Sequence, residues 1–476
     1  MISEQSRQND WLAKSSIKRS LYRAKEALTL ILEGTKPKNT IAVLDGVRAL
    51  AILTVIFYHL SVKSGVKNIP WLDVHIVALI YMGYGGVTLF FVLSGFLLFL
   101  PYIKSLLFDN TWPSVRMFYL RRALRIMPAY YLSLFLLILL AQPLYLQPDH
   151  WKELLLFLTF TMDFSQKTFQ HLNAPFWSLA VEWQFYMLLP WLALALRFVV
   201  QRGSLRQRVW ILILCLGGVI AWGITTRYWG NYITEHPNIH LGLPPVVFKV
   251  IVAFLYGCGG PGLHGKFLED FAIGMLISLC YMLTRNIPSE KWNNFLRRLS
   301  PVLLAGSLLW LAIMAFWSSE LLVPPSKDAF ATFFYGDAYT TFHEFGIALG
   351  YGGLVLAVLF GGALLKQIFE WSLLRWIGIV SFTMYIWHNP IFLPFADAMA
   401  PFVHNWSPFR VFCLNLLWVI IAIPSFSFLG YVLIEKPFMR ISDGLRRSQQ
   451  QKVKEDVPVS QILPSVAPVT QSSQEW

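Results

Sequence analysis

The chain has 476 residues, of which 56% are hydrophobic and only 14% are charged, with a mean hydropathy of +0.53. Charged residues make up about a quarter of a soluble domain, so this composition excludes an ordinary soluble protein and indicates a multi-pass membrane protein. The net charge of +13 reports membrane topology first, and we expect no nucleic-acid partner. Four cysteines, three of them in apolar runs, indicate neither a disulfide framework nor a metal site.

Residues 1–43 precede the first apolar run that is long enough to span a membrane, and we interpret them as a cytoplasmic leader. Within them, WLAKSSIKRSLYRAKEALTLILEG places basic residues among leucines and isoleucines. This pattern predicts a basic amphipathic helix on an anionic membrane surface, with a merely solvated helix as the alternative. The basic residues are Lys14, Lys18, Arg19, Arg23 and Lys25.

The first predicted span, LDGVRALAILTVIFYHL at 44–60, carries ionisable groups that a lipid anchor would not have. Arg48 and His59 are eleven residues apart, about 20° past three full turns, so they share one face roughly 16 Å apart along the helix axis. Asp45 lies one turn before Arg48 on nearly the same stripe. Charged groups at membrane depth usually face a bundle interior and mark a site. The alternative is an Asp45–Arg48 pair at the helix start plus one hydrogen-bonded core histidine.

Further spans are predicted near 76–100, 129–146, 176–196, 209–228, 267–284, 301–317, 345–365, 376–399 and 411–434, which makes ten. The stretch 151–162 is too short to cross and fits a re-entrant or interfacial piece. With both termini in the cytoplasm, 29 of the 39 Lys and Arg residues lie inside and 9 outside. A crossing at 151–162 would move the four arginines of 197–208 outside, against the positive-inside rule. The predicted fold is therefore an all-α, polytopic membrane helix bundle of about ten transmembrane helices.

Two other stretches bear on the organisation of the chain. The external segment 229–266 contains VVFKVIVAFLYG at 246–257, which fits either a re-entrant element lining a cavity or a loop that merely packs. Residues 441–476 form a predicted cytoplasmic tail, and from Ser448 onward the sequence has little to bury and is expected to be disordered. Because no soluble domain is evident, the chemistry is expected inside the membrane domain, 44–440.

Polar residues recur at four places in the predicted spans. FFVLSGFLL at 90–98 brings Ser94 and Gly95 into an apolar helix, where the glycine permits close approach of a ligand or of another helix. FYLRRALRIMPAYY at 118–131 places Arg122 and Arg125 as i, i+3 neighbours that could fork around phosphates, with positive-inside anchoring as the alternative.

The other two places are aromatic-rich. FWSLAVEWQFYMLLP at 176–190 buries Glu182, and a lone buried carboxylate is costly enough to indicate function. Trp177 and Ser178, in the same motif, are additional candidates. SFTMYIWHNP at 381–390 holds His388, which is more often a capping or core histidine than a catalytic one.

In their order, the motifs LDGVRALA…FYH, FFVLSGFLL, RRALRIMP, FWSLAVEWQFY, SFTMYIWH and IEKPF, over roughly 44–440, resemble the acyltransferase-3 family of integral membrane O-acyltransferases. The resemblance implies an enzyme of the cell (plasma or inner) membrane, with ten core helices and no bound cofactor. It also implies transfer of an acyl group, often acetyl, from cytoplasmic acyl-CoA to a hydroxyl of a glycan or lipid-linked sugar.

The resemblance implies that Arg48 and His59 match the essential pair of the family. It also implies that Arg122 and Arg125 match its donor-side arginines and that Glu182 matches its membrane carboxylate. One departure is that the family often has a second acidic residue directly after the first, where this chain has Trp183. Any role that needs two carboxylates is therefore in doubt.

The chemistry is compatible with these residues. The arginines attract the phosphates of coenzyme A, and imidazole, with a reference pKa near 6.5, suits the removal of a hydroxyl proton at neutral pH. Direct attack by a hydroxyl that His59 activates is the preferred mechanism, and an acyl-histidine relay is the alternative. A proton-coupled transporter or flippase is the alternative function, although the paired broken helices of many transporters are not evident.

Counting helix rise from the assumed span ends predicts where these groups lie. His59, Glu182 and His388 all come out roughly 20 Å above the cytoplasmic face. We therefore expect His59 and Glu182 to share one cavity in the outer half of the membrane, with His388 nearby. The arginines and Ser94 are expected below them.

Overall fold

The computed structural model describes residues 41–236, 238–239, 241–257, 265–287, 289–319 and 336–455, together with Glu26, 28–30 and Leu32. All regular structure in these residues is helical, and the described part of the chain contains no β-strand. The basic residues of the predicted leader helix, 14–25, lie outside the described residues, as does 456–476.

Eight helical segments in the described residues are long and apolar enough to cross a membrane, which makes the chain an all-α, multi-pass membrane protein. Two of them are composite: α3 joins α4 through a short 3-10 turn at Met82–Gly85, and α17 continues through a π-helix at Tyr431–Glu435 into α18. The helices involved are α2 (Val43–Lys63), α3 (Val74–Tyr81), α4 (Gly86–Leu107), α5 (Val115–Leu140), α7 (Phe176–Val200), α8 (Leu205–Glu235), α11 (Glu290–Ser319), α13 (Asp337–Phe360), α17 (Pro408–Gly430) and α18 (Lys436–Glu455).

Two of the ten predicted spans are missing from these eight, and both are present as helices. They are α10 (Leu268–Asn286) and α16 (Ser381–Val403), with 19 and 23 residues. Each is long enough to cross but carries buried polar side chains, Glu269 and Asp270 on α10 and His388 and Asn389 on α16. Both helices outside this set of eight thus hold polar groups inside the bundle.

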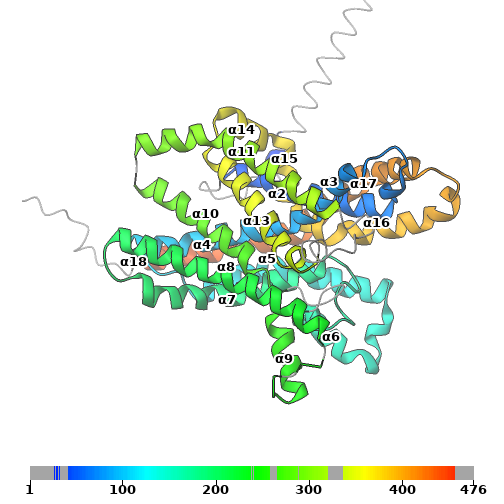
Figure 1. The fold of residues 1–476 in the computed structure, drawn as a ribbon, viewed down its shortest axis with the longest axis horizontal. Coiled ribbons are helices and arrows are strands. Elements are labelled where there is room, and N and C mark those ends of the chain that lie inside the picture. The colour runs from blue at the N-terminus through cyan, green and yellow to red at the C-terminus, as the bar shows by residue number, and fades with distance from the viewer. Residues whose placement is uncertain are drawn as a thin grey trace, which may run out of the picture.

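Both polar helices pack inside the bundle. Helix α10 contacts α4, α8 and α13, and α16 contacts α2, α5 and α17. Figure 1 shows α4, α7 and α8 running alongside one another. At Gly95 of α4 a Cβ would meet the carbonyl oxygen of Phe271 at 2.1 Å, so α10 packs directly on the α4 backbone there. Gly95 therefore serves helix packing, the second of the two roles considered for it.

The connection between α5 and α7 folds into the bundle. Helix α6 (Trp151–Leu158) has eight residues, too few to cross a bilayer, as predicted for this stretch. After it, Asp163, Thr168 and Asn173 are all buried. The amide of Asn173 donates to the backbone oxygen of Ile386, on α16, at 2.8 Å. Helix α7 therefore begins inside the bundle.

Several predicted boundaries shift. Helix α5 begins at Val115, capped by Ser114, whose hydroxyl accepts from the Met117 amide, so the arginines lie within the helix and not before a span at 129–146. Helix α9 (Pro245–Leu255) leaves most of its apolar residues exposed and projects from the body in Figure 1. Helix α18 runs to Glu455, past Ser448, where regular structure was expected to end.

The start of α2 is fixed by two short helices, α14 (Ala363–Phe369) and α15 (Ser372–Ile379). A Cβ at Gly46 would meet the backbone oxygen of Phe369 at 2.1 Å, and one at Gly378 would meet that of Asp45 at 1.8 Å. These glycines let both helices approach the turn of α2 that carries Arg48, which positions that side chain.

Candidate active site

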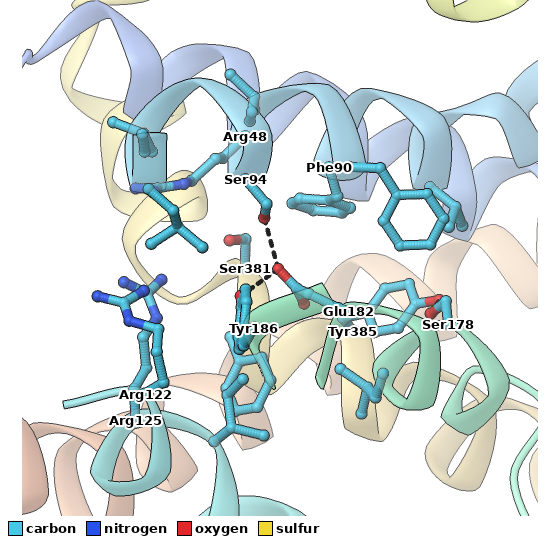
Figure 2. A pocket seen from close by; sticks show the side chains of 18 residues that line it. Arg48, Phe90, Ser94, Arg122, Arg125, Ser178, Glu182, Tyr186, Ser381 and Tyr385 are labelled. Carbon is cyan, nitrogen blue, oxygen red and sulfur yellow. Dashed lines mark hydrogen bonds between the residues drawn. The ribbon is translucent and has the colours of Figure 1, made fainter. Parts of the chain in front are cut away.

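A cavity of about 80 Å³ lies where α2, α4, α5, α7 and α16 meet, with room for several water molecules. Six of the ten residues singled out from the sequence line it, which defines a site that we call the arginine chamber (Figure 2). Those six are Arg48, Ser94, Arg122, Arg125, Ser178 and Glu182.

Glu182 is the centre of the hydrogen bonding in the chamber. The Ser94 hydroxyl donates to its Oε1 at 2.5 Å, and the Tyr186 hydroxyl donates to the same oxygen (Figure 2). Tyr186 lies one turn after Glu182 on α7, so the helix itself presents donor and acceptor to each other. The two hydroxyl donors satisfy a carboxylate that would otherwise be costly to bury at membrane depth.

Three guanidinium groups face this single carboxylate across the chamber. Arg48 lies 3.5 Å from Asp45, on its own helix. Arg122 and Arg125 lie side by side, and Arg122 stacks over the Tyr186 ring at 5.9 Å (Figure 2). Among the residues that the structure describes, neither Arg122 nor Arg125 forms an ion pair with a carboxylate. A lining with more cations than anions favours an anionic ligand.

A second carboxylate near the arginines was not singled out from the sequence. Glu435 is buried at the end of the π-helix and accepts a hydrogen bond from the Thr383 hydroxyl at 2.9 Å. It interacts electrostatically with Arg125 and Arg48. The IEKPF motif that contains it was one signal, and π-helical turns frequently occur at functional sites.

His59 and His388 form a pair outside the chamber lining, with ring centroids 5.0 Å apart. His59 Nδ1 lies 2.9 Å from the backbone oxygen of Val55, and His388 Nδ1 lies 2.8 Å from that of Tyr385. A carbonyl oxygen only accepts, so this network assigns the proton of each neutral ring to Nδ1 and leaves Nε2 as the basic nitrogen. In the described residues, the buried Nε2 of His388 has no hydrogen-bond partner.

Tyr385 separates the chamber from the histidine pair. It lines the chamber, its hydroxyl lies 2.5 Å from that of Ser178, and its ring lies 5.8 Å from that of His388. Sequence reasoning missed Tyr385 and Tyr186 because tyrosines in aromatic-rich helices usually pack. The available signals were the i, i+3 spacing to His388 and the i, i+4 spacing from Glu182.

Two other sequence candidates lie outside the chamber lining. Asp45 interacts with Arg48 but does not line the cavity. Trp177 packs its ring against those of Phe91 and Phe267. Trp177 therefore belongs to an aromatic wall beside the site.

The expected depth of Glu182 was wrong. Glu182 was placed level with His59 and above Ser94, yet it is hydrogen-bonded to Ser94 and lies among the arginines, whereas the cavity that it lines includes neither histidine. The count of helix rise assumed that α7 begins at the membrane surface. Because Asn173 already contacts Ile386 inside the bundle and α7 begins three residues later, at Phe176, six further residues bring Glu182 to the level of the arginines.

Comparisons with known proteins identify relatives of this chain. The chain matches the acyltransferase domain of the acyltransferase-3 family over residues 41–434. It is 24% identical over 377 residues to the peptidoglycan O-acetyltransferase OatA of Listeria monocytogenes, covering 73% of this chain and 49% of the relative. A Staphylococcus aureus protein provisionally named an O-acetyltransferase is 27% identical over 241 residues, covering 45% of this chain and 34% of the relative.

The chain thus spans between a third and half of the length of these relatives. No solved structure is significantly similar to it. The family match covers most of the chain and includes every helix that lines the arginine chamber or carries the histidine pair. This chain belongs to the acyltransferase-3 family.

Proposed function

We propose that this protein is an O-acyltransferase that moves an acyl group from acyl-CoA on the cytoplasmic side of the membrane to a hydroxyl of a glycan on the outer side. The observation that carries the proposal is the juxtaposition of a cation-rich cavity and a histidine pair, separated by Tyr385. The cavity suits a phosphate-bearing donor, and the pair supplies a base.

Donor binding is assigned to the arginine chamber. Coenzyme A carries several phosphate charges, and Arg122 and Arg125 present two neighbouring guanidinium forks that form no ion pair with a carboxylate among the described residues. The uncharged pantetheine arm can then extend past Ser94 and Glu182 toward Tyr385. Glu182 limits the net positive charge of the chamber and holds the Ser94 and Tyr186 hydroxyls in place.

The acid–base step is assigned to His59, with Nε2 as the base. In direct transfer the acceptor oxygen attacks the thioester carbonyl carbon, the carbon–sulfur bond breaks, and the electron pair leaves with the coenzyme A thiolate. The hydroxyl proton goes to Nε2 of His59, whose Nδ1–H is held by the Val55 carbonyl. In the relay alternative, the same nitrogen first takes the acyl group.

The acceptor is proposed from the named relatives. OatA is a peptidoglycan O-acetyltransferase by name. A Bacillus subtilis protein provisionally named as a peptidoglycan O-acetyltransferase is 25% identical over 365 residues. We take acetyl as the acyl group and peptidoglycan as the first acceptor to test.

The test is label transfer. Membranes that contain the protein receive acetyl-CoA labelled in the acetyl group together with peptidoglycan, and ester-linked label in the glycan is measured. Label should appear with the wild type and not with His59→Ala. A proton-coupled transporter would give no ester-linked label with either protein, and that result would overturn the proposal.

A further inference from the structure

A second group of buried charges lies away from the arginine chamber, where α8, α10 and α13 pack together. Arg227 of α8 makes two hydrogen bonds to Oε1 of Glu269, the one from Nε at 3.1 Å. Asp270 and Glu344 also act electrostatically on Arg227. We call Arg227, Glu269, Asp270 and Glu344 the acid cluster.

The acid cluster holds three carboxyl groups against one guanidinium. Arg227 is 3% exposed, Glu269 1% and Asp270 0%, so water does not solvate these three groups, whereas Glu344 is only partly buried. Glu269 is the ion-pair partner of Arg227, and the close approach that this requires is made possible by Gly223, where a Cβ would lie 2.3 Å from Glu269 Oε2. The carboxyl group of Asp270 therefore needs another means of neutralisation.

Asp270 has no ion-pair partner of this kind among the described residues. Neither of its carboxyl oxygens has a hydrogen-bond partner among the residues that the structure describes. The groups that act on it electrostatically are Arg227, Glu269 and Glu344, two of which repel a negative charge. The residues that the structure describes contain no group of three His, Cys, Asp or Glu side chains arranged to hold a metal ion. A buried carboxyl group in this setting is neutralised by binding a proton.

The other side chains around the cluster do not supply the missing charge. On α4, Thr88 donates to Glu344 at 3.4 Å. On α13, His343 Nε2 lies 2.9 Å from the Met314 carbonyl and its Nδ1 lies 3.2 Å from the Tyr84 hydroxyl. Nε2–H donates to the Met314 carbonyl and Nδ1 can accept from the Tyr84 hydroxyl, so a neutral imidazole satisfies both contacts.

A row of aromatic rings runs from the acid cluster to the histidine pair. Tyr84, bonded to His343, lies edge to face with Tyr58 at 5.9 Å. Tyr58 lies edge to face with His59 at 5.1 Å. The cluster is thus connected through packed titratable side chains to the base assigned above.

We propose that Asp270 carries a proton in the resting protein and that the acid cluster exchanges protons with the histidine pair during acyl transfer. This inference rests on the proposed function. In that reaction the coenzyme A thiolate leaves toward the cytoplasm, where a thiol with an ordinary pKa of about 8.5 takes a proton from water. The proton that His59 removed from the acceptor hydroxyl stays on the imidazole and must be passed on before the next cycle. The acid cluster is the recipient: Asp270 takes up this proton as it passes its own to Glu344, which is only partly buried and releases it to water, so each cycle leaves the cluster as it began.

The experiment compares wild type, Asp270→Asn and the matched control Asp397→Asn, an exposed carboxylate that pairs with Lys63. Infrared difference spectra of the purified proteins, recorded without substrate, report the carbonyl band of a protonated carboxylic acid. Transfer assays report kcat, the KM for acetyl-CoA and the pH dependence of kcat.

Asp270→Asn should fold normally, because an uncharged amide replaces an uncharged acid of the same shape, and the acid band should be missing. Its kcat should fall roughly 10- to 100-fold with a changed pH profile and an unchanged donor KM. Asp397→Asn should match the wild type in every respect.

Three results would overturn the inference: a wild type without the acid band, an unfolded Asp270→Asn variant, or an Asp270→Asn variant with an unchanged kcat. An unfolded variant would show that Asp270 is an ionised partner of Arg227. An unchanged kcat would show that the proton on Asp270 has a structural role alone. If the wild type transfers no acyl group at all, the proposed function fails. The infrared comparison still reports separately on the proton.

Discussion

The arginine chamber and the acid cluster are both groups of buried charges in a membrane bundle, and their charge balances are opposite. The chamber lining presents three guanidinium groups and one carboxylate around a cavity, and Asp45 and Glu435 act on these arginines from outside the lining. The cluster presents three carboxyl groups to one guanidinium, and neither oxygen of Asp270 has a hydrogen-bond partner among the described residues. An excess of cations around open space suits a phosphate-bearing molecule, whereas an unpaired acid packed among side chains suits a proton. The two regions are therefore suited to different ligands.

The largest expected effect is at the histidine pair. His59→Ala removes the proposed base and should lower kcat about 10²- to 10⁴-fold, while acetyl-CoA still binds because the chamber is intact. His404→Ala, at an exposed histidine whose Nδ1 bonds to the Pro401 carbonyl, is the matched control and should transfer normally. Appreciable transfer by His59→Ala would remove His59 from the catalytic role.

Truncation of the chamber carboxylate should lower the stability of the protein more than truncation of a chamber arginine does. Glu182→Ala leaves the buried hydroxyls of Ser94 and Tyr186 without an acceptor and should cost about 2–4 kcal/mol of stability. Glu182→Gln retains an oxygen acceptor and should cost less. The measurement is thermal unfolding of the purified protein in detergent. Equal unfolding temperatures for all three proteins would show that the hydrogen bonds of Glu182 do not hold the chamber together.

The affinity for acetyl-CoA should depend on the arginine chamber and not on the acid cluster. Arg122→Ala and Arg125→Ala should each weaken acetyl-CoA binding roughly 10- to 100-fold, the worth of a charge-assisted hydrogen bond. Lysine should rescue only in part, because it cannot form a bidentate fork. Binding of labelled acetyl-CoA to purified protein is the measurement.

The control for these variants is Arg121→Ala, on the same helix but outside the chamber lining. It should bind acetyl-CoA as the wild type does. Asp270→Asn, in the acid cluster, should also leave the donor affinity unchanged. Unaltered affinity in both chamber variants would return Arg122 and Arg125 to membrane anchoring.

The smallest effect is expected where the chamber meets the histidine pair. Tyr385→Phe retains the ring but loses the hydrogen bond to Ser178, which is worth about 0.5–1.5 kcal/mol. We expect a few-fold rise in acetyl-CoA hydrolysis without acceptor, because water passes a loosened Tyr385 more easily. Ser178→Ala removes the same bond and should behave alike. If only one of the two variants hydrolysed acetyl-CoA faster, the hydrogen bond between Tyr385 and Ser178 would not be what holds water back.

The sequence predicted well those features that depend on one helix. The prediction of an all-α, multi-pass membrane protein needed only composition and span length, and the structure agrees with it. Arg122 and Arg125, expected to act together because they are i, i+3 neighbours, line the same cavity. Such predictions need no tertiary contact because helical spacing translates directly into geometry.

Features that depend on where a helix begins were harder to predict. Glu182 was misplaced because the chain just before α7 is already inside the bundle, where Asn173 contacts Ile386. The acid cluster was missed because Glu269 and Asp270 sit at the start of a span, where charges are ordinary in a sequence. Glu435 depends on a π-helical turn that no spacing rule anticipates.

The central claim is that a donor in the cytoplasm and an acceptor outside meet across one bundle. Sealed right-side-out vesicles loaded with labelled acetyl-CoA and supplied externally with peptidoglycan test it most directly. The account predicts ester-linked label on the external glycan with the wild type and none with His59→Ala. Label that appears only when donor and acceptor share one side of the membrane would contradict it.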